Sequence, residues 1–255
     1  EKAFDFSGMG ARNGVTAAVM AQMGFSGVWD VLDGEHNVLI ALSTAPKPEE
    51  MIAGLGSRFF VTETAIKPYS VGYPIQAALA AFLQLHREHQ LTADNVERIV
   101  VRLPEDGARV VNNRSMPDVN CQHIIALALV EGAVSFEDSH SYERMKDPKV
   151  RAVKERVELV ADKSLMDPEA PRSSRVEVTL KGGRTVSHFT RHAPGTKENP
   201  LATEEVNAKA RSLMAPVLGA GPTEEVIRRV NALEAVKDVR ELRPFLTHGS
   251  ERGKA

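Results

Sequence analysis

An internal disulfide bond is excluded, because the 255 residues include a single cysteine, Cys121. So few cysteines are typical of proteins in a reducing compartment, and we therefore expect a cytoplasmic location. Long apolar runs are also missing from the sequence. No run approaches the roughly 20 residues that a membrane-spanning helix needs, so we expect no membrane partner.

An excess of charge of either sign is absent as well. Lysine and arginine total 32 against 34 aspartates and glutamates, which gives a net charge of −2. Proteins that bind nucleic acid by electrostatics carry strongly basic regions, so we expect no nucleic-acid partner. Zinc-ligand spacing is lacking too, since His86 and His89 form an i, i+3 pair without companion ligands. We predict no metal site.

The sequence does contain enough apolar material for a sizeable core, with 42% hydrophobic and 26% charged residues. Helical patterns dominate both ends of the chain. Residues 11–24 carry an apolar stripe that should end at Gly24. Further helices are expected at 37–43, 49–54, 203–218 and 223–235.

The middle of the chain mixes strand and helix patterns. Residues 58–62 look strand-like, 75–89 and 120–132 are typical of helices, and 95–104 alternate like a strand. A helix should begin at Asp147-Pro148 and lead into a short strand near 159–161. The clearest local signal is 174–189, where residues alternate and Gly182-Gly183 supplies the positive φ angles of a two-residue hairpin turn.

This order of elements predicts an α+β fold class, because strands and helices are segregated along the chain. The simplest arrangement is a discontinuous all-helical domain with a smaller α+β domain inserted in it. The helical domain would consist of residues 1–57 and 194–255, and the inserted α+β domain of residues 58–193.

The connection from Thr64 to Gln76 is unusual in composition. Two prolines, a glycine and two tyrosines predict a fixed, non-repeating crossing between the strand-like run and the following helix. Lys67 is the only charge between Glu63 and Arg87. A single cation on a stiff connection suits an anionic ligand. The plainer interpretation is a surface lysine on a domain linker.

Several short motifs follow one another along almost the whole chain. They are Lys2 followed by GMGARNG at 8–14, GFSG at 24–27, LDG at 32–34, Lys67-Pro-Tyr69, the apolar helix ending at Gly132, Asp147-Pro-Lys-Val150, Gly182-Gly183, and Gly195 with NPL at 199–201. No single motif is diagnostic. Together, their order and spacing resemble the MmgE/PrpD family, over roughly the C-terminal half of a full-length member.

The resemblance implies an enzyme. The family includes 2-methylcitrate dehydratase, cis-aconitate decarboxylase and iminodisuccinate epimerase, which act on small polycarboxylates without an obligatory metal. It therefore implies a lyase or isomerase that moves a proton at a carbon α to a carboxylate and needs no cofactor. It also implies a large helical domain and a smaller α+β domain with the active site between them, and a homodimer.

The resemblance also implies roles for five residues. Lys2 and Lys67 would bind substrate carboxylates and stabilise the enolate-like charge that forms as a proton leaves. His123 would act with Lys67 in catalysis, as a general acid or base. Taken alone, His123 is more simply a hydrogen-bonded histidine inside an apolar helix. Tyr69 and Gln76 would orient the ligand, or only pack and begin the helix.

Two positions depart from the family pattern. Many members have cysteine or histidine where this chain has Gly72, and histidine where it has Gln76. Two proton-transfer groups are therefore missing from the crossing. The alternative is a non-catalytic carboxylate-binding or dimerisation module, or the C-terminal half of a split enzyme. Half of a helical domain would expose apolar surface, so we expect that the chain alone is not a stable monomer and is inactive.

Overall fold

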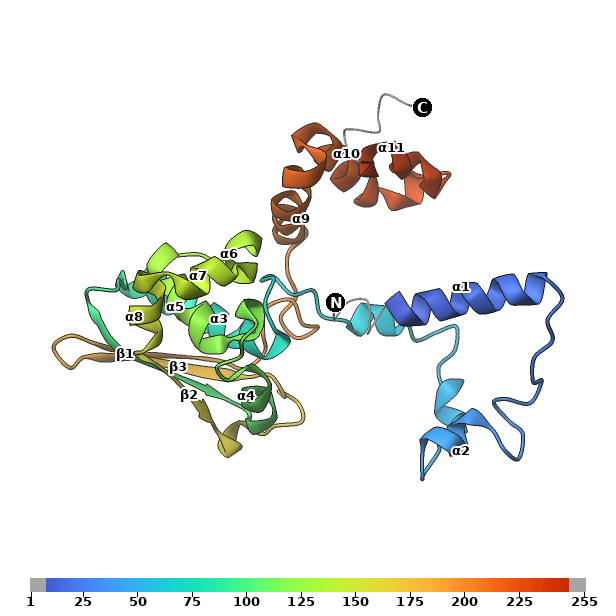
Figure 1. Ribbon diagram of the computed structural model, residues 1–255, viewed down its shortest axis with the longest axis horizontal. Coiled ribbons are helices and arrows are strands. Elements are labelled where there is room, and N and C mark those ends of the chain that lie inside the picture. Colours follow the sequence, from blue (N-terminus) through green and yellow to red (C-terminus); the bar gives the residue numbers. More distant parts are fainter. Residues whose placement is uncertain (1–7, 248–255) are drawn as a thin grey trace. The chain divides into compact units, whose positions relative to one another are not determined.

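The structure is a computed structural model that describes residues 8–247. Its contacts divide the chain into two compact units, residues 1–59 and residues 60–255 (Figure 1). The structure combines helices with a small four-stranded sheet in which two of the three strand pairs are antiparallel, so the α+β fold class is confirmed. The insertion of one domain into the other stays a prediction.

The regular elements in the described part of the first unit are helices joined by turns and irregular segments. It contains α1 (Met9–Gln22), α2 (Val38–Leu42) and the 3₁₀ turn η2 (Pro48–Met51). The predicted first helix and its end are confirmed, because Gly24 adopts a φ of +92° just beyond α1. No side chain between residues 8 and 59 is buried, and the apolar Val15 and Val19 of α1 are exposed. The expectation that this chain is not a stable monomer stays a prediction.

The second unit is built on a four-stranded sheet with the order β2-β1-β3-β4. Its strands are β1 (Val96–Leu103), β2 (Val157–Ala161), β3 (Ser174–Leu180) and β4 (Thr185–Thr190). Strand β1 runs parallel to β2 and antiparallel to β3, and β3 and β4 form the predicted hairpin. A parallel pair needs a long crossover, and here the connection from β1 to β2 contains five helices.

The helices of the second unit either cover the sheet or follow it in sequence. Figure 1 shows α3, α5 and α8 on one side of the sheet. Before and between the strands lie α3 (Gln76–His89), α4 (Glu105–Val111), α5 (Cys121–Glu131), α6 (Phe136–His140), α7 (Tyr142–Lys146) and α8 (Pro148–Lys154). After β4 come α9 (Thr203–Leu218), α10 (Ala220–Val230) and α11 (Arg243–Leu246).

The core of this unit lies between the sheet and helices α3 and α5. The predicted inward face of β1 is confirmed, since Ile99, Val101 and Leu103 are all fully buried. Helix α5 is apolar on nearly all sides and is buried from Cys121 to Leu129, as expected for a helix surrounded by other elements. Gly132, with a φ of +74°, ends α5 as predicted.

Two local predictions are wrong. Residues 58–62 do not form a strand; the chain there enters a 3₁₀ turn, η3 (Phe60–Glu63), because a short apolar run has no intrinsic strand geometry without a partner strand. The hairpin loop has three residues, 181–183, since Thr179 pairs with Thr185 and the Leu180 N–H donates to the Arg184 carbonyl. Both Gly182 and Gly183 still adopt positive φ angles.

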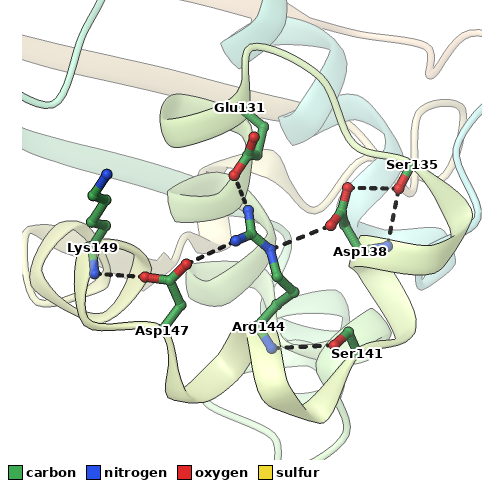
Figure 2. Close-up of polar contacts among 7 residues, drawn as sticks. All are labelled: Glu131, Ser135, Asp138, Ser141, Arg144, Asp147 and Lys149. Carbon is green, nitrogen blue, oxygen red and sulfur yellow. Dashed lines mark hydrogen bonds and ion pairs between the residues drawn. The ribbon is translucent and has the colours of Figure 1, made fainter.

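One arginine joins the helices of the β1–β2 crossover. Figure 2 shows the Arg144 guanidinium between three carboxylates, those of Glu131 at the end of α5, Asp138 in α6 and Asp147 at the start of α8. The Nη1 of Arg144 lies 2.7 Å from Asp147 Oδ2, and its Nε lies 3.3 Å from Asp138 Oδ1. A shared, partly buried cation of this kind stabilises more than an isolated surface pair.

We expect Arg144→Ala to lower the free energy of unfolding by about 2 kcal/mol, because three carboxylates lose their shared cation. The matched control is Lys146→Ala in the same helix. Among residues 8–247, Lys146 pairs only with Glu143, and the two side chains are 70% and 81% exposed, so its loss should cost less than about 0.5 kcal/mol. Urea denaturation of both variants measures the difference. Equal midpoints would contradict a structural role for the cluster.

Candidate functional site

The crossing between η3 and α3 is fixed by hydrogen bonds to distant parts of the second unit. The Ile66 N–H donates to the Gly195 carbonyl at 2.8 Å, and the Gly72 N–H donates to the Asp118 carbonyl at 2.8 Å. A 3₁₀ turn, η4 (Tyr73–Ile75), then leads directly into α3. The predicted fixed crossing is therefore present, held at both ends by backbone contacts.

Gln76 fastens the crossing from inside. Its side chain is fully buried, and its Nε2 donates to the carbonyls of Tyr69 at 2.9 Å and Val71 at 3.1 Å. Its Oε1 accepts the Tyr69 N–H at 3.3 Å. The amide of Gln76 thus contacts the backbone in this structure, and its contact with a ligand stays a prediction. Close packing of the crossing favours glycine at position 72, because an added Cβ would lie 3.0 Å from Val119 Cγ1.

Lys67 lies on the exposed side of this loop. Its Nζ donates to the Val71 carbonyl at 3.1 Å, the carbonyl that also accepts from Gln76. Between residues 8 and 247 no carboxylate forms an ion pair with Lys67. An ammonium group has three N–H donors, so donors remain for a ligand. The fold therefore presents a positioned cation without a carboxylate counter-ion, as an anion site requires.

Tyr69 lies next to Lys67 and packs against the core. Burial raises the pKa of the Tyr69 hydroxyl, Arg87 lowers it, and Glu205 of α9 raises it again. The phenol is therefore protonated at neutral pH and can act as a hydrogen-bond donor. Lys67, Tyr69 and Gln76, all predicted from the sequence, are brought together by the crossing.

Lys209, a half-buried residue of α9, also contacts the crossing, although it was not predicted as a site residue. Its Nζ donates to the backbone carbonyl of Lys67, 142 residues earlier in the chain. Burial lowers the pKa of Lys209, and the positive charge of Lys67 lowers it further. No local pattern around residue 209 announces this contact, because its partner is remote in sequence.

His123 occupies a different environment. Its imidazole is 1% exposed, and its Nε2 has no hydrogen-bond partner among the described residues. Burial, followed by the positive charges of Lys154 and Arg144, lowers the pKa of His123 to about 4. The ring is therefore neutral at pH 7, and no hydrogen bond or ion pair within residues 8–247 joins it to Lys67, Tyr69 or Gln76.

Lys2, a predicted substrate-binding residue, lies outside the described residues. Cys121 is fully buried, and burial raises the pKa of its thiol to about 12. Within the described part of the chain no helix is both long and apolar enough to cross a membrane. The general acid or base role of His123 stays a prediction.

A hollow of about 620 Å³ lies between the crossing, α6 and α9. The crossing contributes Pro68 and Ser70, α6 contributes Phe136, and α9 contributes Lys209 and Leu213. Its walls are largely apolar, and the charged side chains that line it are Glu137, Glu205 and Lys209. A pocket with apolar walls and a few charged groups is the usual form of a site for a small organic ligand.

Comparison with known proteins identifies relatives of this chain. The family model described as the MmgE/PrpD C-terminal domain matches residues 69–235. The cis-aconitate decarboxylase of Mus musculus is 25% identical over 270 residues, which cover 97% of this chain and 53% of the relative. The cis-aconitate decarboxylase of Homo sapiens is 26% identical over 251 residues, with coverages of 94% and 51%.

A second activity is represented among the relatives. The mitochondrial 2-methylcitrate dehydratase of Yarrowia lipolytica is 26% identical over 133 residues, which cover 47% of this chain and 25% of the relative. The chain spans about half the length of the cis-aconitate decarboxylases that it matches.

Proposed function

This chain belongs to the MmgE/PrpD family, and from that premise we propose that it forms the C-terminal part of a lyase for a small polycarboxylate. The relatives are named for cis-aconitate and 2-methylcitrate, which both carry three carboxylates. The observation that supports the proposal is Lys67, an ammonium group on a braced crossing without a carboxylate partner among the described residues.

With a hydroxylated substrate such as 2-methylcitrate, the proposed reaction removes a proton from a carbon α to a carboxylate and expels the hydroxyl group of the neighbouring carbon as water, which leaves a double bond. With cis-aconitate, CO2 leaves instead and the carbon chain takes up a proton. Negative charge then spreads onto the carboxylate oxygens in an enolate-like transition state. Lys67 would stabilise this charge, because a positioned cation needs no reorganisation as the charge forms. Tyr69, whose raised pKa keeps its hydroxyl protonated, would donate a hydrogen bond to the substrate. Lys2 would hold a further carboxylate.

His123 would transfer the proton from its neutral form. With a pKa lowered to about 4 it holds almost no positive charge at pH 7. Its unprotonated ring nitrogen can accept a proton, but the low pKa makes it a weak base, and it is a poor source of an imidazolium proton. An isomerase outcome, in which the proton returns to the same carbon, follows from the same chemistry. A homodimer, a cytoplasmic location and independence from metals belong to this proposal as well.

We expect the complete protein to convert cis-aconitate or 2-methylcitrate, as followed by proton NMR of substrate and product. Lys67→Ala and His123→Ala should each lower kcat/KM at least tenfold, a loss of about 1.4 kcal/mol of transition-state stabilisation. Lys146→Ala, which removes an exposed cation far from the crossing, is the matched control. Wild-type rates in Lys67→Ala and His123→Ala would refute the roles given to Lys67 and His123. Binding of citrate without turnover would support a non-catalytic module.

A further inference from the structure

Lys209 does not form the ion pair that its helix offers. Glu205 lies four residues before it on α9, the spacing and order that favour a glutamate–lysine pair on a helix. Within the described residues the two side chains do not pair. Glu205 Oε2 accepts the Ala202 N–H at 2.8 Å, at the start of α9, and Lys209 Nζ donates to the Lys67 carbonyl.

The ammonium groups of Lys67 and Lys209 therefore both donate to backbone carbonyls of the crossing. Lys67 Nζ donates to the Val71 carbonyl and Lys209 Nζ donates to the Lys67 carbonyl, so neutral acceptors orient both lysine side chains. No carboxylate between residues 8 and 247 forms an ion pair with either lysine. The positive charge of Lys67 is the second cause of the lowered pKa of Lys209, after burial.

Two arginines of the same unit, by contrast, lie against carboxylates. Arg172 lies 2.7 Å from Asp106, and Arg191 lies 3.0 Å from Asp167. These two arginines line a second hollow, of about 330 Å³, on the Glu63 and Tyr73 side of the crossing. Lys67 and Lys209 have no such carboxylate among residues 8–247, so both ammonium groups can pair with carboxylates of a ligand.

We propose that Lys209 is a second carboxylate-binding residue and that Lys67 and Lys209 together hold two carboxylates of one substrate molecule. The carbon chain of the substrate would lie over Pro68 and Ser70, in the hollow of about 620 Å³ that Lys209 lines. This inference rests on the proposed function, since it names the charge pattern that the same site selects. Monocarboxylates would leave one ammonium group without a partner.

A purely structural role for Lys209 makes a different prediction. If Lys209 only tethers α9 to the crossing, a neutral donor at this position should replace it. Lys209→Gln keeps an N–H donor and removes the charge, whereas Lys209→Met removes both. Lys209→Arg keeps both. The three variants therefore separate the effect of the Lys209 charge from the effect of its hydrogen bond to the Lys67 carbonyl.

The test is calorimetric titration of the complete protein with succinate and butyrate, which have four carbons each and differ by one carboxylate. We expect wild type and Lys209→Arg to bind succinate at least tenfold more tightly than butyrate. Lys209→Met and Lys209→Gln should lose about tenfold in succinate affinity and little in butyrate affinity. Lys146→Met, an exposed control in α7, should match wild type.

Two outcomes overturn the inference in distinguishable ways. Wild-type succinate affinity in Lys209→Gln, together with a loss in Lys67→Met, would leave Lys67 as a binding residue and refute a role for the charge of Lys209. Wild-type affinity in Lys67→Met, or no binding of succinate by wild type, would refute the proposed function and this inference together.

Discussion

Gly195→Ala is expected to lower the free energy of unfolding of the second unit by about 4 kcal/mol, enough to unfold a marginally stable protein. Gly195 is buried in the loop after β4, where its carbonyl accepts the Ile66 N–H at 2.8 Å. A Cβ at this position would lie 1.8 Å from the Ile66 carbonyl oxygen and 2.9 Å from its carbon. These are backbone atoms, so no side-chain rotation can relieve the overlap.

Backbone conformation adds to the cost of this substitution. Gly195 has a φ of +88°, a region that residues with a Cβ adopt at a cost of about 1 kcal/mol or more. The loop would have to move, and the hydrogen bonds from Ile66 to Gly195 and from Gly195 to the Asn199 carbonyl would be lost. Each such bond contributes about 1 kcal/mol net.

Gly182→Ala is the matched control for the Gly195 substitution. Gly182 has a φ of +100°, and an added Cβ there meets no atom within 4 Å. It should therefore cost only the conformational penalty of about 1 kcal/mol. Urea denaturation of both variants separates the two effects. A Gly195→Ala protein as stable as Gly182→Ala would show that the contact with Ile66 is not rigid.

Gly195→Ala should also weaken ligand binding, because Ile66, which the added Cβ would meet, immediately precedes Lys67. Where Gly195→Ala still folds, we expect its succinate affinity to fall with its stability, while Gly182→Ala binds as wild type does. The glycine therefore links the stability of the second unit to the position of the candidate site.

The sequence predicted those elements whose signal is local. The helix from Ile75 to His89 and the strand from Val96 to Leu103 are confirmed, because their apolar residues recur at the helix and strand periods. The hairpin also followed from neighbouring residues. The prediction of a strand at 58–62 failed, because a five-residue run with three apolar residues fits a strand or a turn equally well until a partner strand is known.

The site was predictable only in part, for a related reason. The composition of the crossing singled out Lys67, and the family resemblance added Tyr69, Gln76 and His123. The contact between Lys67 and Lys209 joins residues 142 positions apart, and no motif marks it. The burial of the Gln76 amide depends on carbonyls presented by a folded loop. Contacts of this kind come from tertiary structure, which single-sequence periodicity does not encode.

The stability of the second unit should fall as the pH is lowered from 7.5 to 5, partly because of His123. The pKa of His123 is about 4 in the folded protein, whereas an unperturbed histidine has a pKa of about 6.5. Between these values the unfolded chain binds more protons than the folded one, so stability is lost as pH falls through the unfolded pKa. Two protonation equilibria 2.5 units apart give a loss of about 2 kcal/mol by pH 5 and about 3 kcal/mol in total.

His123→Gln isolates this contribution, because the carboxylates and the other histidines titrate in both proteins. The difference in unfolding free energy between wild type and His123→Gln should shrink by about 2 kcal/mol between pH 7.5 and 5. If the variant does not fold, the Cε1 proton of His123 gives the same answer by NMR, with a midpoint near 4. A midpoint near 6.5, with a constant free-energy difference, would mean that water reaches the ring. His123 could then serve as an imidazolium acid, and its neutral role in the proposed reaction would be wrong.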